Sequence, residues 1–211
     1  DADIMDAAGL IPPNATSADL GFTSTGDVYG INLITTAIDI YVPSLTTNLV
    51  KTGTDLNGED VHPGDVIEYS VSFDNTGDDP AVDVILTDAI PAGTTYVPGS
   101  LEIVADTEPT GPKTDASGDD NAYYDGGNDT VVFHLGTGAT PTSGGEVIPV
   151  SHAGQTHEIS FRVSVDLGTE NSDIVNKADL DYVAELEDFT DEERVLILKD
   201  NASELTRLRP G

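Results

Sequence analysis

Strict alternation of apolar and polar side chains is the feature that most limits the fold of this chain. In the stretch VIEYSVSFD, from Val66, the apolar Ile67, Tyr69, Val71 and Phe73 alternate with polar residues. A period of two predicts a half-buried β-strand. Further strands are predicted at residues 45–51, 81–88, 95–104, 130–136, 157–166, 173–183 and 194–200. The apolar spacing of a long helix is found nowhere, although residues 203–211 could hold one helical turn.

Turn signals separate these strands and predict an all-β, antiparallel β-sandwich. They are HPGD, NTGDDP, PAGT, DGGN, SGG and LGTEN. We expect the sandwich at residues 44–200, after an N-terminal tail and extension strand at 1–43 and before a C-terminal tail at 201–211. Residues 108–128 form a long insertion rich in Asp and Gly, which does not have a strand pattern.

Charge and composition exclude several classes of partner. The chain has 39 acidic and 8 basic residues and a formal net charge of -31. Nucleic acid is a poor partner, because binding it requires Lys and Arg to neutralise phosphates. Cysteine is absent, so disulfides are excluded. No apolar run reaches the roughly twenty residues of a membrane span. The carboxylates fit either a solvated acidic surface or bound calcium.

Catalytic motifs are missing from the sequence. The four histidines, His62, His134, His152 and His157, do not have the paired spacing of a zinc site. The sequence contains no nucleophile elbow, phosphate-binding loop or dinucleotide fingerprint. Carboxylate pairs occur throughout a chain this acidic, so they do not indicate a glycosidase. We predict that the protein is not an enzyme.

A series of motifs resembles a family of prokaryotic surface-protein repeats. Lys51 lies in the first strand, and Pro-Gly-Asp, Asn-x-Gly, Asp-x-x-Pro-x-Gly-Thr and Asn-x-Ala follow in order. Residues 45–199 thereby resemble the domain of unknown function number eleven. The resemblance implies an immunoglobulin-like Greek-key sandwich in a secreted or surface-anchored protein. Such domains commonly occur in tandem and have structural or adhesive roles without known catalysis. The acidic insertion and the region before residue 45 depart from the family pattern.

Three residues resemble those of the self-formed isopeptide bonds in Gram-positive pilin and adhesin domains. They are Lys51, Asn176 and Asp88. Burial would favour a neutral Lys51 amine that attacks the Asn176 amide, while a protonated Asp88 polarises the amide carbonyl and ammonia leaves. By analogy with disulfides, a link across 125 positions (176 minus 51) would stabilise the fold by roughly 5 kcal/mol. Alternatively, Lys51 is an exposed edge-strand lysine and Asn176 is a cap that faces a loop.

The acidic insertion is a candidate calcium site. Asp74, Asn75, Asp78, Asp79 and Asp83 crowd oxygen ligands in one loop, and the insertion contributes Asp115, Asp119, Asp120, Asp125, Asn128 and Asp129. Neither loop has the spacing of an EF-hand, and a solvated loop is the alternative. Three sequons, at Asn14, Asn128 and Asn201, are glycosylation sites only if the source glycosylates asparagine.

Residues 30–43, GINLITTAIDIYVP, read as a strand that precedes the sandwich. In tandem repeats of the resembling family, this position holds the last strand of the preceding repeat. A neighbouring copy could accept the strand, with Ile31, Leu33, Ile38, Ile40 and Val42 as its apolar residues. Repeated head to tail, this donation gives an extracellular filament, pilus-like fibre or surface layer, a homopolymer of this chain. The alternative is a stalk or adhesive module of a larger cell-surface protein, with a host or cell-surface ligand.

Overall fold

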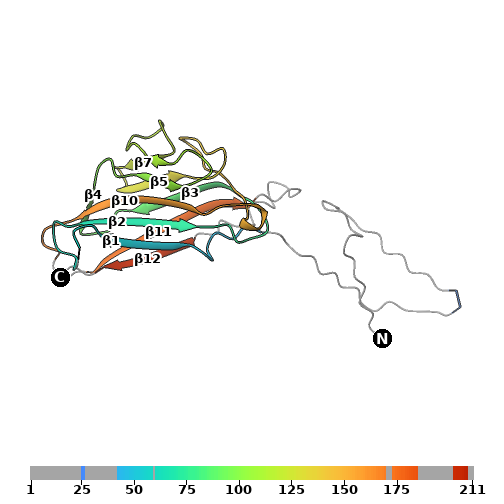
Figure 1. Ribbon diagram of the computed structural model, residues 1–211, viewed down its shortest axis with the longest axis horizontal. Coiled ribbons are helices and arrows are strands. Elements are labelled where there is room, and N and C mark those ends of the chain that lie inside the picture. The colour runs from blue at the N-terminus through green and yellow to red at the C-terminus, as the bar shows by residue number, and fades with distance from the viewer. Residues whose placement is uncertain (1–24, 27–41, 59, 170–172, 185–201, 209–211) are drawn as a thin grey trace.

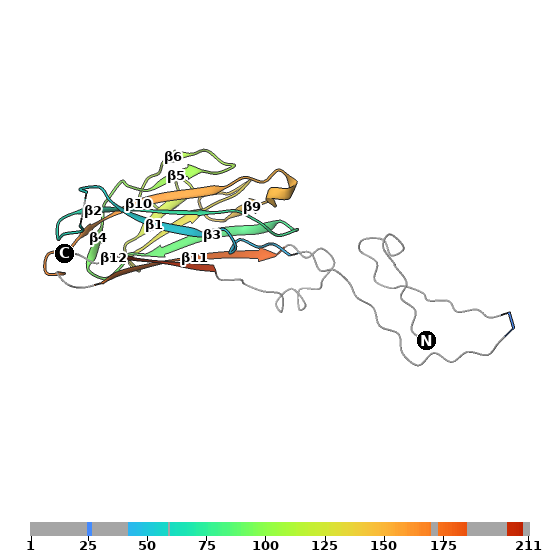
Figure 2. The ribbon, with the colours of Figure 1, turned by 60° about the horizontal axis from the view of Figure 1, so that its bottom comes forward.

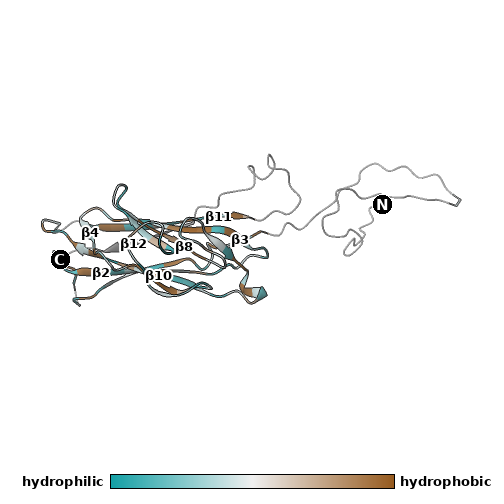
Figure 3. Ribbon diagram, turned by 90° about the horizontal axis from the view of Figure 1, so that it is seen from above, coloured by the Kyte–Doolittle hydropathy of each residue, from teal (hydrophilic) through white to brown (hydrophobic). Residues whose placement is uncertain are grey.

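The described part of the chain folds into two antiparallel β-sheets packed face to face (Figure 1). The computed structural model describes residues 25–26, 42–58, 60–169, 173–184 and 202–208, the last of these by their backbone. Seen from above, β3, β8, β11 and β12 lie in one layer and β2 and β10 in the other (Figure 3). The predicted sandwich is therefore confirmed, while residues 1–24 and 27–41 of the expected tail and extension strand lie outside the described residues.

Each sheet has six strands within the described residues. The first sheet has the order β1-β2-β10-β5-β6, with β4 also paired to β10. Its strands are β1 (Val50–Asp55), β2 (Val66–Phe73), β4 (Thr94–Tyr96), β5 (Glu102–Ala105), β6 (Gly111–Pro112) and β10 (His157–Val165). The second sheet has the order β12-β11-β3-β8-β7, with β9 also paired to β3. Its strands are β3 (Ala81–Ala89), β7 (Ala122–Asp125), β8 (Thr130–His134), β9 (Gly145–Val147), β11 (Ile174–Ala184) and β12 (Ala202–Leu208). A short 3₁₀ helix, η1 (Val150–His152), precedes β10.

The strand order is that of an immunoglobulin-like sandwich. Strands β1-β2-β10-β5 correspond to the A-B-E-D sheet of that fold, and β12-β11-β3 correspond to G-F-C. The additional strands β6 to β9 all lie between β5 and β10 in the chain. Within them, β7 and β8 continue the second sheet beyond β3. The acidic insertion, which has no strand pattern in the sequence, thus contains β6 and β7.

The alternating residues form the core as expected. In β2, Ile67, Tyr69, Val71 and Phe73 are all fully buried, whereas the residues between them are partly exposed. Strand β11 alternates in the same way over its eleven residues. One face of each sheet therefore packs against the other sheet, and this face holds the few polar side chains that are buried between them.

Three boundaries differ from the predictions. Strand β1 begins at Val50, not at residue 45, because Leu45 and Leu49 are buried from a turn. A turn at Pro98 and Gly99 divides the run predicted at residues 95–104 into β4 and β5. The prediction of a helical turn in the C-terminal tail is wrong, since Ala202–Leu208 is a strand paired to β11. The strand predicted at 194–200 lies outside the described residues.

Asn75 fixes the point at which the chain enters the sandwich. The Asn75 side chain is fully buried and accepts hydrogen bonds from the backbone N–H groups of Ser44 (3.1 Å) and Gly77 (3.0 Å). It donates to the carbonyls of Asp79 and Val147 at 2.8 and 2.9 Å. All four hydrogen-bonding positions of the amide are therefore used, and the residues before β1 are tied to the β2–β3 loop.

The chain enters and leaves the described sandwich at opposite ends (Figures 1 and 2). Val42 accepts a hydrogen bond from the backbone of Asp78, in the loop that follows β2. Strand β12 ends at Leu208, which pairs with Ile174 beside the loop between β10 and β11. This loop is at the other end, because β2 and β10 run antiparallel and Phe73 pairs with His157.

Candidate functional site

Lys51, Asp88 and Asn176 come together inside the sandwich. Lys51 projects inward from β1, at the edge of the first sheet. Asp88 and Asn176 project inward from the adjacent strands β3 and β11 of the second sheet. The exposed fractions of the three residues are 6%, 0% and 1%. The alternative of an exposed edge lysine is therefore wrong, and Asn176 lies within a strand and does not cap a loop.

The Lys51 amine is held by one carboxylate and two aromatic rings. Its Nζ donates a hydrogen bond to Asp88 Oδ2. Nζ also lies 5.2 Å from the centre of the Tyr69 ring and 5.8 Å from that of Phe161, within the range of cation–π attraction. Burial lowers the pKa of Lys51, and the nearby Asp88 charge opposes this shift. The site therefore favours a neutral amine more than water does.

Asp88 is a carboxyl group suited to hold a proton. Burial raises its pKa to about 7, although the charge and hydrogen bond of Lys51 act in the opposite direction. Asn176 lies close enough for its amide to lower the pKa of Asp88, although neither of its side-chain polar atoms meets the geometry of a hydrogen bond. Burial thus brings the pKa values of Lys51 and Asp88 closer together, which favours proton transfer between them.

The site contains an excess of unpaired polar atoms. Among the described residues, seven buried side-chain N or O atoms have no hydrogen-bond partner. Four of the seven belong to Tyr69 (Oη), Asp88 (Oδ1) and Asn176 (Nδ2 and Oδ1). Buried polar groups are nearly always paired in folded proteins, and unpaired ones commonly mark reactive or strained sites. The geometry places an amine, a proton acceptor and a primary amide together in an apolar core.

The pH dependence of stability tests the state of Asp88 in a Lys51→Met variant. The folded-state pKa of Asp88, about 7, already lies above its ordinary 3.8, and removing the cation raises it further. The protonated carboxyl therefore stabilises the folded state below the ordinary value, and this contribution is lost as pH rises through the folded-state pKa. We expect the free energy of unfolding, measured in urea, to fall as pH rises from about 4 through neutrality and to level off above the folded-state pKa. Because Lys51→Met/Asp88→Asn lacks the titrating group, an identical pH dependence in the two variants would contradict this assignment.

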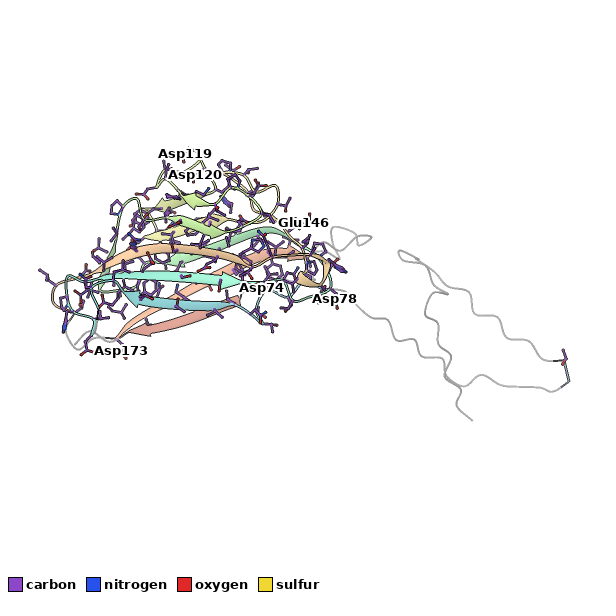
Figure 4. The ribbon with its side chains drawn as sticks, viewed as in Figure 1. Asp74, Asp78, Asp119, Asp120, Glu146 and Asp173 are labelled. Atoms are coloured by element: carbon purple, nitrogen blue, oxygen red, sulfur yellow. The ribbon has the colours of Figure 1, made fainter. Side chains whose placement is uncertain are left out.

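The candidate calcium ligands do not converge. Among the residues that the structure describes, no group of three or more Asp, Glu, His or Cys side chains could hold a metal ion. Asp115 accepts hydrogen bonds from Tyr96 and Gly99, and Asp119 and Asp120 accept from Thr114. Asp125 accepts from Gly127 and Asn128, and Asp129 from Tyr124. Asp119 and Asp120 lie on one rim of the molecule, apart from Asp74 and Asp78 (Figure 4). Calcium binding stays a prediction.

The predicted glycosylation sites and the predicted donated strand do not include Lys51, Asp88 or Asn176. Of the sequons, Asn128 lies in an exposed turn after β7, while Asn14 and Asn201 lie outside the described residues. Of the five apolar residues of the predicted donated strand, only Val42 is described. It is 41% exposed and precedes the first turn. Ile31, Leu33, Ile38 and Ile40 belong to the part of the chain that the structure does not describe.

Two features of the interior were missed in the sequence. Tyr69 and Phe161 flank Lys51, but alternation alone marks them only as core residues. His157 forms a buried pair with Asp106, with Nδ1 and Oδ1 2.9 Å apart, and its ring stacks on Phe73. Asp106 also accepts a hydrogen bond from the backbone of Gly136. The pair therefore joins the start of β10 to the segments that follow β5 and β8. Nothing in the sequence pattern relates His157 to Asp106, which lies 51 residues earlier.

Comparisons with known proteins give distant structural likenesses. The chain matches no protein-family model, and no curated protein matches it in sequence. Its structural neighbours are collagen-binding adhesin domains and major pilins. A collagen-binding domain from a Staphylococcus aureus adhesin is 14% identical, with a TM-score of 0.46, and the match covers 79% of this chain and 99% of that one.

The pilin neighbours are longer proteins. The full-length major pilin SpaD of Corynebacterium diphtheriae is 12% identical, with a TM-score of 0.47, over 75% of this chain and 34% of SpaD. The major pilin subunit BcpA of Bacillus cereus is 9% identical, with a TM-score of 0.47, over 77% of this chain and 40% of BcpA. The chain thus spans between a third and a half of either pilin. The described residues form no helix with the length and hydropathy needed to cross a membrane.

Proposed function

We propose that this chain is a structural subunit of an extracellular filament, pilus-like fibre or surface layer, with its two sheets joined by an isopeptide bond between Lys51 and Asn176. The observation that carries the proposal is the burial of Lys51, Asp88 and Asn176 between the sheets, with Lys51 bonded to Asp88 and Asn176 close to Asp88. The chain has no cysteine, so an isopeptide bond would supply the covalent link that disulfides give to many extracellular proteins. The resemblance to surface-protein repeats points to the same location, the cell surface.

The bond forms in three balanced steps. The Lys51 ammonium transfers one proton to Asp88, and the neutral amine then attacks Cγ of Asn176. The protonated Asp88 donates a hydrogen bond to Asn176 Oδ1 and stabilises the negative charge that develops there. The bond from Cγ to Nδ2 breaks, and Nδ2 leaves as ammonia with its two hydrogens and one from the amine. Asp88 keeps the transferred proton, and no cofactor is required.

Head-to-tail assembly by donation of the N-terminal strand completes the proposal. The donated residues are Ile31, Leu33, Ile38, Ile40 and Val42, and the partner is another copy of the chain. Two observations support this arrangement. Val42 is exposed where the chain enters the sandwich, and Leu208 ends β12 at the opposite end. Copies joined through these ends would form a line of domains, because such a contact is heterologous and does not close.

A stalk or adhesive module of a larger cell-surface protein is the second candidate. The observation that favours it is the insertion between β5 and β10, whose exposed Asp119 lies on the rim of the molecule (Figure 4). Such loops could engage a host or cell-surface ligand, or calcium. This candidate shares the Lys51–Asn176 bond but does not require the donated strand.

Removing residues 1–43 distinguishes the two candidates. We expect the full chain to form filaments or SDS-resistant oligomers, visible by electron microscopy and native size measurement, and the truncated chain to be monomeric. A full chain with Ile38→Asp and Ile40→Asp is the matched control, since it keeps the length and changes only the apolar face of the strand. A full chain that stays monomeric would instead favour the stalk.

A further inference from the structure

Tyr69 carries a buried hydroxyl that neither the core nor the reaction above uses. The residue lies in the middle of β2 and is 0% exposed. Its Oη has no hydrogen-bond partner. The hydroxyl of a buried tyrosine usually finds a partner, because leaving it unpaired in an apolar core is costly. Phenylalanine would fill the same space without this cost, so the hydroxyl requires an explanation.

The position of Tyr69 relates it to the reacting groups. Tyr69 is diagonal to Lys51 across the β1–β2 pair, in which Lys51 is opposite Val71. The centre of its ring lies 5.2 Å from Lys51 Nζ, so the ring is one wall of the amine's surroundings. Burial, followed by the charge of Asp88, raises the pKa of Tyr69. The phenol therefore keeps its proton and is available as a hydrogen-bond donor near Asp88.

The unpaired atoms form complementary donors and acceptors. The donors are the Tyr69 hydroxyl and Asn176 Nδ2, and the acceptors are Asp88 Oδ1 and Asn176 Oδ1. The reaction removes Nδ2 as ammonia, and Asn176 Oδ1 takes the hydrogen bond from protonated Asp88. Only the Tyr69 hydroxyl and Asp88 Oδ1 then remain, one a donor and the other an acceptor.

We propose that Tyr69 is a positioning residue for isopeptide formation: its hydroxyl donates to Asp88 Oδ1 and holds Oδ2 toward Lys51 and Asn176. The inference rests on the proposed Lys51–Asn176 bond. Tyr69 acts through Asp88 and does not touch the atoms that form the bond. The charged and titratable groups that face Asp88 are Lys51 from β1 and Tyr69 from β2, and the charge of Asp179 acts on it from the outer face of β11.

The rate of cross-linking in Tyr69→Phe tests the role. Radiolabelled full-length chain is made by cell-free translation, chased at a series of pH values around neutrality and quenched in SDS. Cross-linked and linear chains are then separated by gel mobility and confirmed by mass. We expect Tyr69→Phe to cross-link roughly tenfold more slowly, since a hydrogen bond to a charged group is lost. A long chase that still reaches complete cross-linking shows that the variant folds.

The pH profile separates positioning from a loss of packing. A hydroxyl that donates to the carboxylate lowers the pKa of Asp88, so its removal moves the high-pH limb of the rate profile to higher pH. A packing defect would lower the rate at every pH without moving that limb. Tyr96→Phe, which removes a partly buried hydroxyl bonded to Asp115, is the matched control and should leave rate and profile unchanged.

The outcomes are distinguishable from those of the proposed function. A wild-type chain that never loses ammonia would overturn both the isopeptide bond and the role of Tyr69. A wild-type chain that cross-links, with Tyr69→Phe equal to it in rate and pH profile, would overturn the role of Tyr69 alone. A slower Tyr69→Phe with an unmoved limb would reduce Tyr69 to a packing residue.

Discussion

Replacing Lys51 with methionine is expected to lower the free energy of unfolding by roughly 5 kcal/mol, because the unfolded chain regains the freedom of a loop of 125 positions (176 minus 51). Methionine has a side chain of similar volume to lysine, but it lacks the amine and therefore cannot form the cross-link. Chemical denaturation measures the stability change. Whole-chain mass spectrometry should show the wild-type chain lighter than its sequence mass by one ammonia, and the variant at its full sequence mass.

Two further variants isolate the cross-link from the local change. Asn176→Ala removes the other half of the bond. This variant should have the full mass of its own sequence, and its free energy of unfolding should fall by a similar amount. Lys177→Met removes an exposed lysine of the same strand that pairs with Asp179, so the variant should keep the loss of one ammonia and almost the full stability. A wild-type chain at its full sequence mass would contradict the bond directly. A mass loss of one water, in place of ammonia, would indicate that Lys51 had joined Asp88 instead of Asn176.

Pulling on the ends of the chain should release far less length from the wild type than from Lys51→Met. Tension that enters before β1 passes along the chain to Lys51, crosses the bond to Asn176 in β11 and leaves through β12. The residues between the two linked positions, 52–175, carry no load while the bond is intact. When the variant unfolds they extend fully, which adds on the order of 400 Å of contour length.

Single-molecule force spectroscopy of the full chain measures this difference. The wild type, Lys51→Met and Lys177→Met are compared with the same handles at both ends. Only Lys51→Met should gain the additional length, since Lys177→Met keeps the bond. Equal contour lengths in all three chains would mean that the bond does not form, whatever the stability of the fold.

The sandwich could be predicted from the sequence because its strands alternate regularly. Strands β2 and β11 have inward side chains at every second position, and one apolar face is sufficient to assign them. The start of β1 could not be predicted, because Leu45 and Leu49 are buried from a turn and mimic a strand. Strand β12 was missed, since its sequence, ASELTRL, lacks an apolar face and depends on pairing with β11.

The candidate site was predicted only in part. Lys51, Asp88 and Asn176 were identified by resemblance, but their burial and contact depend on the packing of two sheets, which no spacing in the sequence specifies. Tyr69 was assigned to the core by its place in the alternation, and the signal that could have shown more is its diagonal relation to Lys51 across β1 and β2. The sequence also could not show that the carboxylates of the acidic insertion bond to separate turns. Closeness in sequence does not determine where side chains point.

The four hydrogen bonds of Asn75 make the entry point of the sandwich a rigid joint and not a hinge. Residues 42–44 are held against the β2–β3 loop, and a side chain at Gly77 would collide with the Val42 carbonyl. The direction in which the chain enters the sandwich is therefore set by one buried amide, that of Asn75, together with Gly77.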